Sequence, residues 1–487
     1  MVSNRILFFV LALALPATAQ ASTSAQSAGP GQPSAASGSN RQGSAGQEAK
    51  DASGPDRTPD TLDLQTALSL ALSGNHELRL EDARVAAATA AEAEAQVGYR
   101  PQIFFDELVS RTTQPGMVFG QLLGQERFTA ADFDVDFLNE PDPLTNFTSR
   151  LTVQQSLWAG GRTRSAAHFA RSNRLAVALD RDHNRQEISH QVVEAYSGAL
   201  LARNREDVAR AAVDTALEHV RLASDLGAAG LVVSSDVLLA KVRVSEVDEM
   251  LVTARGESDV ARAQLNLVMG RDQGTPLVLS SAPLSGPDAQ VMEEDVDSLV
   301  AEAWERRRDL QAAGQRVEAS DWEDRRARSG YRPQVGLLGS LEANDEDLFG
   351  VGGTNWTVMA SLRWSLYDGG ATRARLRVAR ELGVQARVQE DLLREQIALQ
   401  VRLAVSRLAA ARQKKTLSQG AVEMAGESLR ILADRYAEGL VPLVELLEAE
   451  DALTRARFRE AAARREMFVA DSLVRLAVGG WSEGGRS

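Results

Sequence analysis

The sequence of 487 residues contains no cysteine, which excludes disulfide bonds, thiolate metal sites, cysteine nucleophiles and a lipid-modified N-terminal cysteine. Aromatic residues make up only 5% of the chain. Alanine, leucine, arginine and glutamate dominate instead, and this composition favours long helices over an ordinary mixed core. After the first residues, no run approaches the roughly 18 apolar residues of a transmembrane helix. Any membrane-embedded part would therefore be built from strands.

The charge pattern and the missing motifs limit the possible functions. The net charge is −13 with both signs interspersed, so nucleic acid, which needs a basic patch, is not an expected partner. No Gly-x4-Gly-Lys-Ser/Thr motif is present, so any energy source would lie in a partner. Glu187 and His190 match half of a di-iron motif, but Gln396 and Leu399 stand at the duplicate positions. We therefore predict no enzyme, no catalytic residue, no metal site and no cofactor.

The N-terminus has the features of a secretory signal peptide. Arg5 precedes an apolar run from Ile6 to Leu15, and Ala17-Thr18-Ala19 forms a cleavage site. We expect residues 1–19 to be the signal peptide, although a membrane anchor or buried helix is the alternative interpretation. Residues 20–60 are rich in Ser, Gly, Ala, Gln and Pro, which predicts a flexible, solvated leader. Residues 481–487 form a short tail.

The remainder is an internal duplication. Gly98-Tyr99-Arg100-Pro101 recurs as Gly330-Tyr331-Arg332-Pro333, which is an offset of 232 in the numbering. Further along the chain the offset is 209, and the smaller value places an insertion between Pro101 and Leu157. The second offset relates three motifs to their copies, which are Ser156–Gly161 to Ser365–Gly370, Gly230–Val232 to Gly439–Val441, and Leu267–Gly270 to Leu476–Gly479.

Each copy predicts a helix, a β-hairpin and a long helical hairpin. Repeat 1 is expected over residues 61–270, with an opening helix from about Asp63 to Val97, a β-hairpin at 102–158 and a helical hairpin at 162–270. Repeat 2 is expected over 296–480, with an opening helix from about Asp297 to Ser329, a β-hairpin at 334–366 and a helical hairpin at 371–479. Residues 271–295 would link the repeats.

Hydrophobic periodicity identifies the strands and helices. From Trp356 to Leu366 every second residue is apolar and most of the others are polar, the pattern of a strand with two unlike faces. Between Arg162 and Gly227 there is no proline, which predicts a rod on the order of 100 Å. Apolar stripes follow both long helices, with Ile188, Val192, Tyr196 and Ala199 in the first and Leu393, Ile397, Val401, Val405 and Leu408 in the second.

These elements cannot be complete within one chain. Two hairpins supply four strands, whereas a bacterial membrane barrel needs at least about eight, so a dimer or a trimer would be the minimum. Long helices with narrow apolar stripes also need neighbours, which a ring of such helices would supply. Strands of this length suit a membrane and the rods suit the periplasm, so the architecture indicates a conduit.

The sequence resembles the TolC-like outer-membrane factor family. The resemblance is carried by Leu62–Leu68, by Asn75-His76-Glu77-Leu78 with His76 where proline is usual, and by the duplication and its Gly-Tyr-Arg-Pro stops. It covers residues 61–480. It implies a homotrimer in which a twelve-stranded outer-membrane β-barrel continues into a twelve-helix periplasmic α-barrel. Such a protein is a passive duct that contacts outer-membrane lipid and partners a periplasmic adaptor and an inner-membrane pump of RND or ABC type.

The turns between the long helices are the first candidate site. On sequence alone they are ordinary glycine-marked helix-hairpin turns. The resemblance implies that they are the tunnel tips that contact the adaptor, and an apolar Leu-Val pair on a polar turn suits a contact surface. The six tip residues are Gly230, Leu231, Val232, Gly439, Leu440 and Val441.

A second candidate site follows these turns. Glu445 and Glu448 are three positions apart on one helix face, so in an oligomer they would form acidic rings that favour cations. A solvated helix face is the simpler interpretation. The resemblance implies a periplasmic gate in which Tyr436 hydrogen-bonds Asp236, while Val441 replaces the arginine that adds a second link. On this view Tyr436→Phe raises the single-channel conductance.

Two alternatives remain open from the sequence. A periplasmic coiled-coil adaptor or structural rod without a pore would also need long helices, although the alternation from Trp356 to Leu366 opposes it. Within the duct interpretation, small-molecule efflux and type I protein secretion are not distinguished. The transported substrate and the resting state of the gate are likewise not encoded in any motif.

Overall fold

The computed structural model describes residues 61–230, 232–280 and 295–480. Four sequence-based expectations lie outside the described residues. They concern the signal peptide at 1–19, the leader at 20–60, the tail at 481–487 and Leu231. Residues 281–294, most of the expected linker, are also outside, whereas its first part is described. There Leu279 pairs with Leu62 and accepts a hydrogen bond from Arg203.

The strands form one antiparallel sheet with the order β1-β2-β3-β4. Its strands are β1 (Gln102–Thr112), β2 (Leu144–Trp158), β3 (Gln334–Asp345) and β4 (Gly353–Arg363). The register separates two faces. One face carries apolar rows such as Phe105, Leu151, Leu341 and Trp356, and the other carries mostly polar rows such as Asp106, Arg150, Glu342 and Asn355. We call these the apolar face and the polar face.

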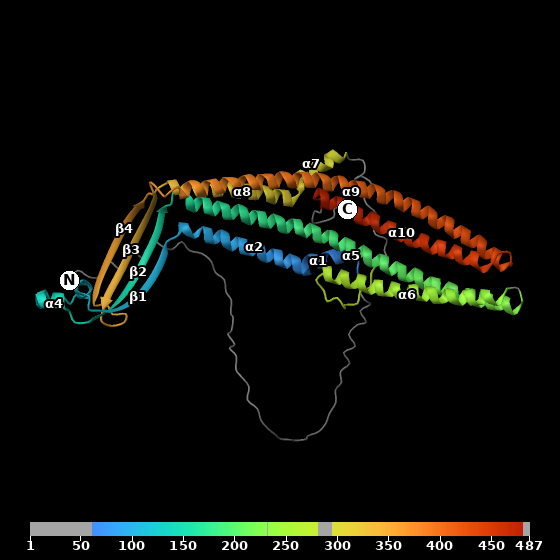
Figure 1. Ribbon diagram of the computed structural model, residues 1–487, viewed down its shortest axis with the longest axis horizontal. Helices are drawn as coiled ribbons and strands as arrows, with labels where there is room; N and C mark the ends of the chain where they lie inside the picture. Colours follow the sequence, from blue (N-terminus) through green and yellow to red (C-terminus); the bar gives the residue numbers. More distant parts are fainter. Residues whose placement is uncertain (1–60, 231, 281–294, 481–487) are drawn as a thin grey trace, which may run out of the picture. The chain divides into compact units, whose positions relative to one another are not determined.

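The helices run away from one end of this sheet (Figure 1). The longest are α5 (Arg162–Ala228) and α9 (Ala371–Ala437), which are equal in length and related by the second offset of the duplication. They return through α6 (Ser234–Val268) and α10 (Leu443–Val478). Shorter helices pack on their sheet-proximal halves, namely α1 (Leu64–Gly74), α2 (His76–Ala95), α7 (Val296–Arg306) and α8 (Arg308–Arg328).

At each level along the long axis of the structure, the contacts place four elements side by side. Next to the sheet the order is α2-α5-α8-α9, and towards the turns it is α6-α5-α10-α9. Together with β1-β2-β3-β4, these orders describe one open row, four elements wide. Among the described residues, none of the helices combines the length and the hydropathy of a membrane-spanning segment.

The opening helices differ from the sequence expectation. Each is broken rather than continuous. Asn75 has extended backbone and accepts hydrogen bonds at Oδ1 from the amides of Glu77 and Leu78, so it caps a new helix. Arg307 is likewise extended between α7 and α8. The expected strand to Leu366 was also too long, because β4 ends at Arg363.

The apolar stripes predicted on α5 and α9 are confirmed as core. Residues Ile188 to Ala199 of α5 pack with α1 and α6, and Tyr196 donates a hydrogen bond to the Leu62 carbonyl over 3.0 Å. Ile397, Val401 and Leu408 of α9 pack with α7 and α10. The two clusters occupy equivalent places in the two repeats, and each ties an opening helix to its own helical hairpin.

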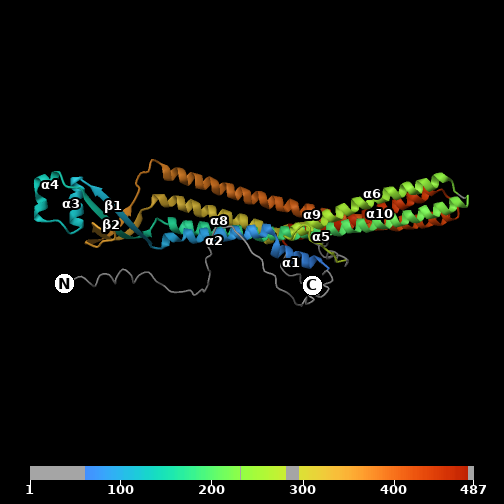
Figure 2. The same ribbon diagram turned by 90° about the horizontal axis from the view of Figure 1, so that it is seen from below.

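The insertion that distinguishes the two repeats lies at the turn of the first β-hairpin. The chain between β1 and β2 forms α3 (Pro115–Gly124), η3 (Ala130–Phe133) and α4 (Val135–Asn139). The second hairpin has only residues 346–352 at this place. Figure 2 shows α3 and α4 at the end of the sheet that is remote from the helices. The two repeats therefore differ most at this end.

Candidate functional site at the helical tips

The two turns at the far end of the helical hairpins have the same backbone geometry. Gly230 and Gly439 lie in the left-handed region with φ of 74° and 73°. The amide of Leu440 donates to the Arg435 carbonyl and the amide of Gly439 to the Tyr436 carbonyl, which closes the end of α9. A Cβ at either glycine would meet no neighbour, so conformation rather than space requires glycine here.

The two residues of the Leu-Val pair in the second turn have different environments, one exposed to solvent and one packed in the core. Leu440 is 67% exposed, whereas Val441 packs against a buried apolar cluster. In the first turn Val232 is half-buried, and the side chain of Leu231 lies outside the described residues. Val233 and Leu238, which no sequence motif marked, are exposed beside this turn. The exposed apolar side chains at the tips therefore include Leu440, Val233 and Leu238, together with Leu239 and Val444.

Behind the turns lies the tip cluster, in which all four long helices meet. Tyr436, the largest member, is 2% exposed near the end of α9. It packs with residues of α5, α6 and α10, and this contact joins the helical hairpin of one repeat to that of the other. The buried members of the tip cluster are Ala223, Ala240, Tyr436, Leu443, Leu446 and Leu447.

The hydrogen bond expected between Tyr436 and Asp236 is absent. The hydroxyl of Tyr436 is buried and has no partner among the described residues. Burial raises the pKa of Tyr436, and the nearby negative charge of Asp236 raises it further. Tyr436 thus contributes to the tip cluster through its ring. The prediction for Tyr436→Phe must be revised, because removing an unpaired buried hydroxyl costs little.

The two acidic residues of α10 lie on its exposed face. Glu445, in the first turn of α10, and Glu448 are both exposed, while Leu446 and Leu447 between them are buried. The second offset of the duplication relates them to Asp236 and Leu239 of α6. Repeat 1 therefore has one acidic residue where repeat 2 has two. The acidic pair is a feature of the second helical hairpin alone.

Two polar contacts, which we call the tip bridges, link the hairpins one helical turn behind the tip cluster. His219 of α5 contacts Glu450 of α10, and both side chains are largely buried. Arg243 of α6 pairs with Asp451 of α10 and also with Glu246 over 3.0 Å. Sequence reasoning missed these residues because the partners are far apart in the chain and belong to no repeated motif.

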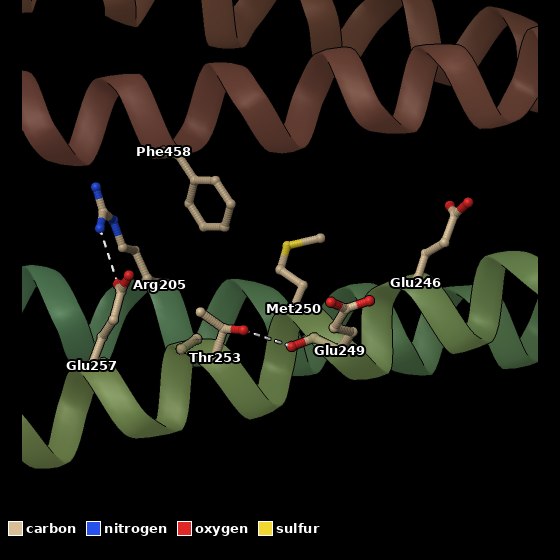
Figure 3. Close-up of a pocket in the computed structure, with 8 residues that line it drawn as sticks. Arg205, Glu246, Glu249, Met250, Thr253, Glu257 and Phe458 are labelled. Atoms are coloured by element: carbon tan, nitrogen blue, oxygen red, sulfur yellow. Dashed lines mark hydrogen bonds and ion pairs between the residues drawn. The ribbon is translucent and has the colours of Figure 1, made fainter.

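Beside the tip bridges an acidic groove of about 460 Å³ separates α6 from α10. Figure 3 shows Phe458 of α10 directed across it towards Met250 of α6. Arg205 pairs with Glu257 over 3.1 Å at one end. Glu246 and Glu249 also line the groove. It is a contact zone between hairpins and holds no arrangement of nucleophile and base.

The residues of the di-iron-like motif are held by other contacts. His183 lies 3.4 Å from Glu187, and Nδ1 of His190 lies 2.6 Å from the Ser472 hydroxyl. Burial lowers the pKa of His190 below its usual value. Within the described residues, no group of three or more histidine, aspartate or glutamate side chains is placed to hold a metal ion.

Comparisons with known proteins identify this arrangement. The model of the family described as "Outer membrane efflux protein" matches residues 67–271 and 299–480. CyaE of Bordetella pertussis is 28% identical over 408 residues, covering 82% of this chain and 80% of its own. The alkaline protease secretion protein AprF of Pseudomonas aeruginosa is 25% identical, with coverages of 71% and 72%. The outer membrane channel CmeC of Campylobacter jejuni has a TM-score of 0.71 at 17% identity, with coverages of 87% and 87%.

The class of protein is therefore an outer-membrane channel, built from a duplicated unit of sheet and long helices. The chain belongs to the outer membrane efflux protein family. This membership confirms the resemblance, the channel fold with its internal repeat and the outer-membrane location with helices in the periplasm. The family is one of channels rather than of enzymes. Membership of a channel family favours the channel over the alternative interpretation, a periplasmic coiled-coil adaptor or structural rod without a pore.

Proposed function

We propose that three copies of the chain close into one continuous duct through the outer membrane and periplasm. The observation that carries this proposal is the open row of four elements, whose edge strands β1 and β4 each pair on one side only among the described strands and whose edge helices α6 and α9 expose apolar side chains. Three copies of four strands make the twelve strands that the family resemblance implies, and the same arithmetic gives twelve helices at each level of the tunnel.

One edge of the row consists of β1, then α2 and then α6. β1 has no pairing partner on its outer side among the described strands, and its exposed Ile103, Phe105 and Val109 lie on the apolar face of the sheet. The opposite edge consists of β4 and α9. β4 is likewise unpaired on its outer side among the described strands, and its exposed Trp356, Val358 and Leu362 lie on the apolar face. The exposed helical residues include Leu238, Val242, Val252, Val260 and Leu267 on α6, and Leu382, Leu392, Leu399, Leu403, Leu417, Met424 and Ile431 on α9. Unlike edges that must pair head-to-tail generate a ring.

The helical tips would form the periplasmic entrance. We propose that Gly230, Leu231, Val232, Gly439, Leu440 and Val441 shape the contact with a periplasmic adaptor, through the exposed Leu440 in particular. Asp236, Glu445 and Glu448 would supply the negative charge of the entrance. Tyr436 would hold the closed state through packing, and the tip bridges would replace the missing arginine link.

The duct would operate with an inner-membrane pump of RND or ABC type, because the chain itself carries no nucleotide-binding motif. The family name supports efflux, and the name of AprF supports secretion of a protein substrate. The tip geometry is compatible with either cargo. The proposed function is therefore the exit duct of a tripartite efflux or type I secretion system.

Cysteine cross-linking tests the ring directly, since the native chain has no cysteine. Val252 lies on α6 and Leu417 on α9, and each is equally far along the chain from the glycine of its own turn, so both sit at a similar distance from the tips. They are 68% and 74% exposed. Oxidation of the Val252→Cys/Leu417→Cys double variant should give a covalent trimer and no larger species.

The single variants are the matched controls and should remain monomeric on a denaturing gel. Cross-linking of either single variant would indicate a two-fold interface, which contradicts a head-to-tail ring. An oxidised double variant that stops at a dimer would also contradict the trimer. Monomeric protein that stays in the periplasmic fraction would refute the duct as a whole.

A further inference from the structure

The insertion in the first β-hairpin packs back over the sheet. α3 contacts β2, β3 and β4, and Val118 and Leu122 of α3 are buried against them. Gln121 donates to the Ser110 hydroxyl of β1 over 2.8 Å. A Cβ on Gly353 of β4 would collide with the Gly124 carbonyl oxygen. The end of α3 is therefore in close contact with the sheet.

The register decides which face α3 covers. Ser110, which accepts from Gln121 of α3, and Asn146, which accepts from Gln125 directly after α3, are paired in the register and share the parity of Asp106 and Arg150, so both belong to the polar face. In a membrane barrel the apolar face meets lipid and the polar face lines the lumen. α3 therefore lies on the side of the sheet that would face the lumen, at the end remote from the periplasm.

A buried polar network fixes this position. The side-chain amide of Gln125, directly after α3, donates to Asn146 Oδ1 over 2.8 Å. Asn146 in turn donates to Asn344 Oδ1 over 2.9 Å, and Thr148 donates to the same atom over 2.9 Å. Arg127 adds an ion pair with Glu346 of the second hairpin turn. Gln125, Asn146, Thr148 and Asn344 are all buried.

We propose that α3 is a lid on the lumen side of the outer mouth, held by the hydrogen bond from Gln125 to Asn146 and through Asn146 to Asn344, and that it restricts passage between the duct and the exterior. The proposal rests on the ring of chains proposed above. Only the first hairpin carries the insertion, so a trimer would present three lids rather than six. The side of α3 away from the sheet has Gly116 and Gly120, where an added Cβ would meet nothing.

Cysteine labelling in intact cells tests the lid. Ser340→Cys places a thiol on the polar face, in the row of Thr152 and Thr357, closer to the helices than the network. A membrane-impermeant maleimide on polyethylene glycol is added outside. We expect slow labelling of this variant, and a labelling rate about tenfold higher when residues 113–143 are replaced by the sequence 346–352. Gln125→Ala, which keeps the insertion and removes its anchor, should raise the rate roughly fivefold, as the loss of one net hydrogen bond predicts.

Two controls complete the experiment. Asp347→Cys, in the exposed second hairpin turn, should label quickly in every variant, and Val358→Cys, on the apolar face, should not label. Equal rates for Ser340→Cys with and without the insertion would overturn the lid while leaving the duct intact. Labelling of Val358→Cys but not of Ser340→Cys would show that the polar face does not line a lumen, which refutes both the lid and the orientation of the proposed barrel. Heat-modifiable migration of each variant on gels reports whether it is folded.

Discussion

Removing one of the two tip bridges, the ion pair of Arg243 with Asp451, should favour opening of the periplasmic end of the duct. The perturbation is Arg243→Met, which keeps an unbranched apolar stem but removes the charged group, combined with Asp451→Asn. The Arg243 side chain is 12% exposed and that of Asp451 is 37% exposed, so their ion pair is partly shielded from water. A pair of this kind should contribute about 1 kcal/mol, the upper end for exposed pairs, to the contact between hairpins.

This contribution determines the expected change in gating. About 1 kcal/mol corresponds to a factor of about five in the closed-to-open ratio of one chain. If the three chains open together, the three contributions add to about 3 kcal/mol and the factor exceeds about one hundred. The open probability of single channels in planar bilayers, measured for both single variants and the double variant, gives the coupling between the two residues.

The control is an ion pair at the same level that stays within one helix. Arg221 and Glu218 of α5 flank His219 closely in the sequence, and their side chains are 72% and 67% exposed. Arg221→Met should leave the open probability unchanged. If the effects of Arg243→Met and Asp451→Asn are additive, or if the control variant opens the channel equally, the reasoning from the tip bridges is refuted.

Three other outcomes are expected. Tyr436→Phe should leave the conductance unchanged, because the hydroxyl that it removes has no partner among the described residues. Tyr436→Ala should weaken the tip cluster by about 3–5 kcal/mol and raise the conductance. A larger conductance for Tyr436→Phe would contradict this reasoning and support a hydrogen bond between Tyr436 and Asp236. Glu445→Gln with Glu448→Gln should reduce cation selectivity in reversal-potential measurements, and an unchanged reversal potential would place both residues outside the pore. Thermal stability should fall as the pH drops below about 6.5. Burial lowers the pKa of His190 in the folded chain, so the unfolded chain binds the proton more readily. His190→Gln should make the melting temperature, recorded by circular dichroism, less dependent on pH in this range.

Much of the fold is encoded in patterns that repeat along the chain. One constant offset relates α5 to α9 and α6 to α10, and the alternation near Trp356 identifies β4. These predictions succeeded because each depends on a local period, of two residues in strands and about 3.6 in helices. The helix breaks at Asn75 and Arg307 were missed, although Gly74-Asn75 is a recognisable stop followed by a cap.

The site was less predictable because its decisive contacts join distant residues. Tyr436 was selected by resemblance, but only the packing shows that its ring is used and its hydroxyl is not. The tip bridges join residues of one repeat to residues of the other, and no local pattern marks His219 or Arg243. The direction in which α3 folds is likewise set by a distant contact, because Gln125 bonds Asn146 of β2, which in turn bonds Asn344 of β3.

The two repeats differ most at the two places where we propose that the duct opens and closes. The helical cores of the two halves are equivalent, so duplication accounts for the row and its length. The halves diverge at the two ends. At the helical tips Glu448 corresponds to Leu239 in the duplication, and at the far end of the sheet α3 has only the turn at 346–352 as its counterpart. The proposed periplasmic gate lies at the first of these ends and the proposed lid at the second, and the 67 residues of α5 separate the two. The two ends should therefore respond independently, with the tip bridges affecting entry and the anchor of α3 affecting exit.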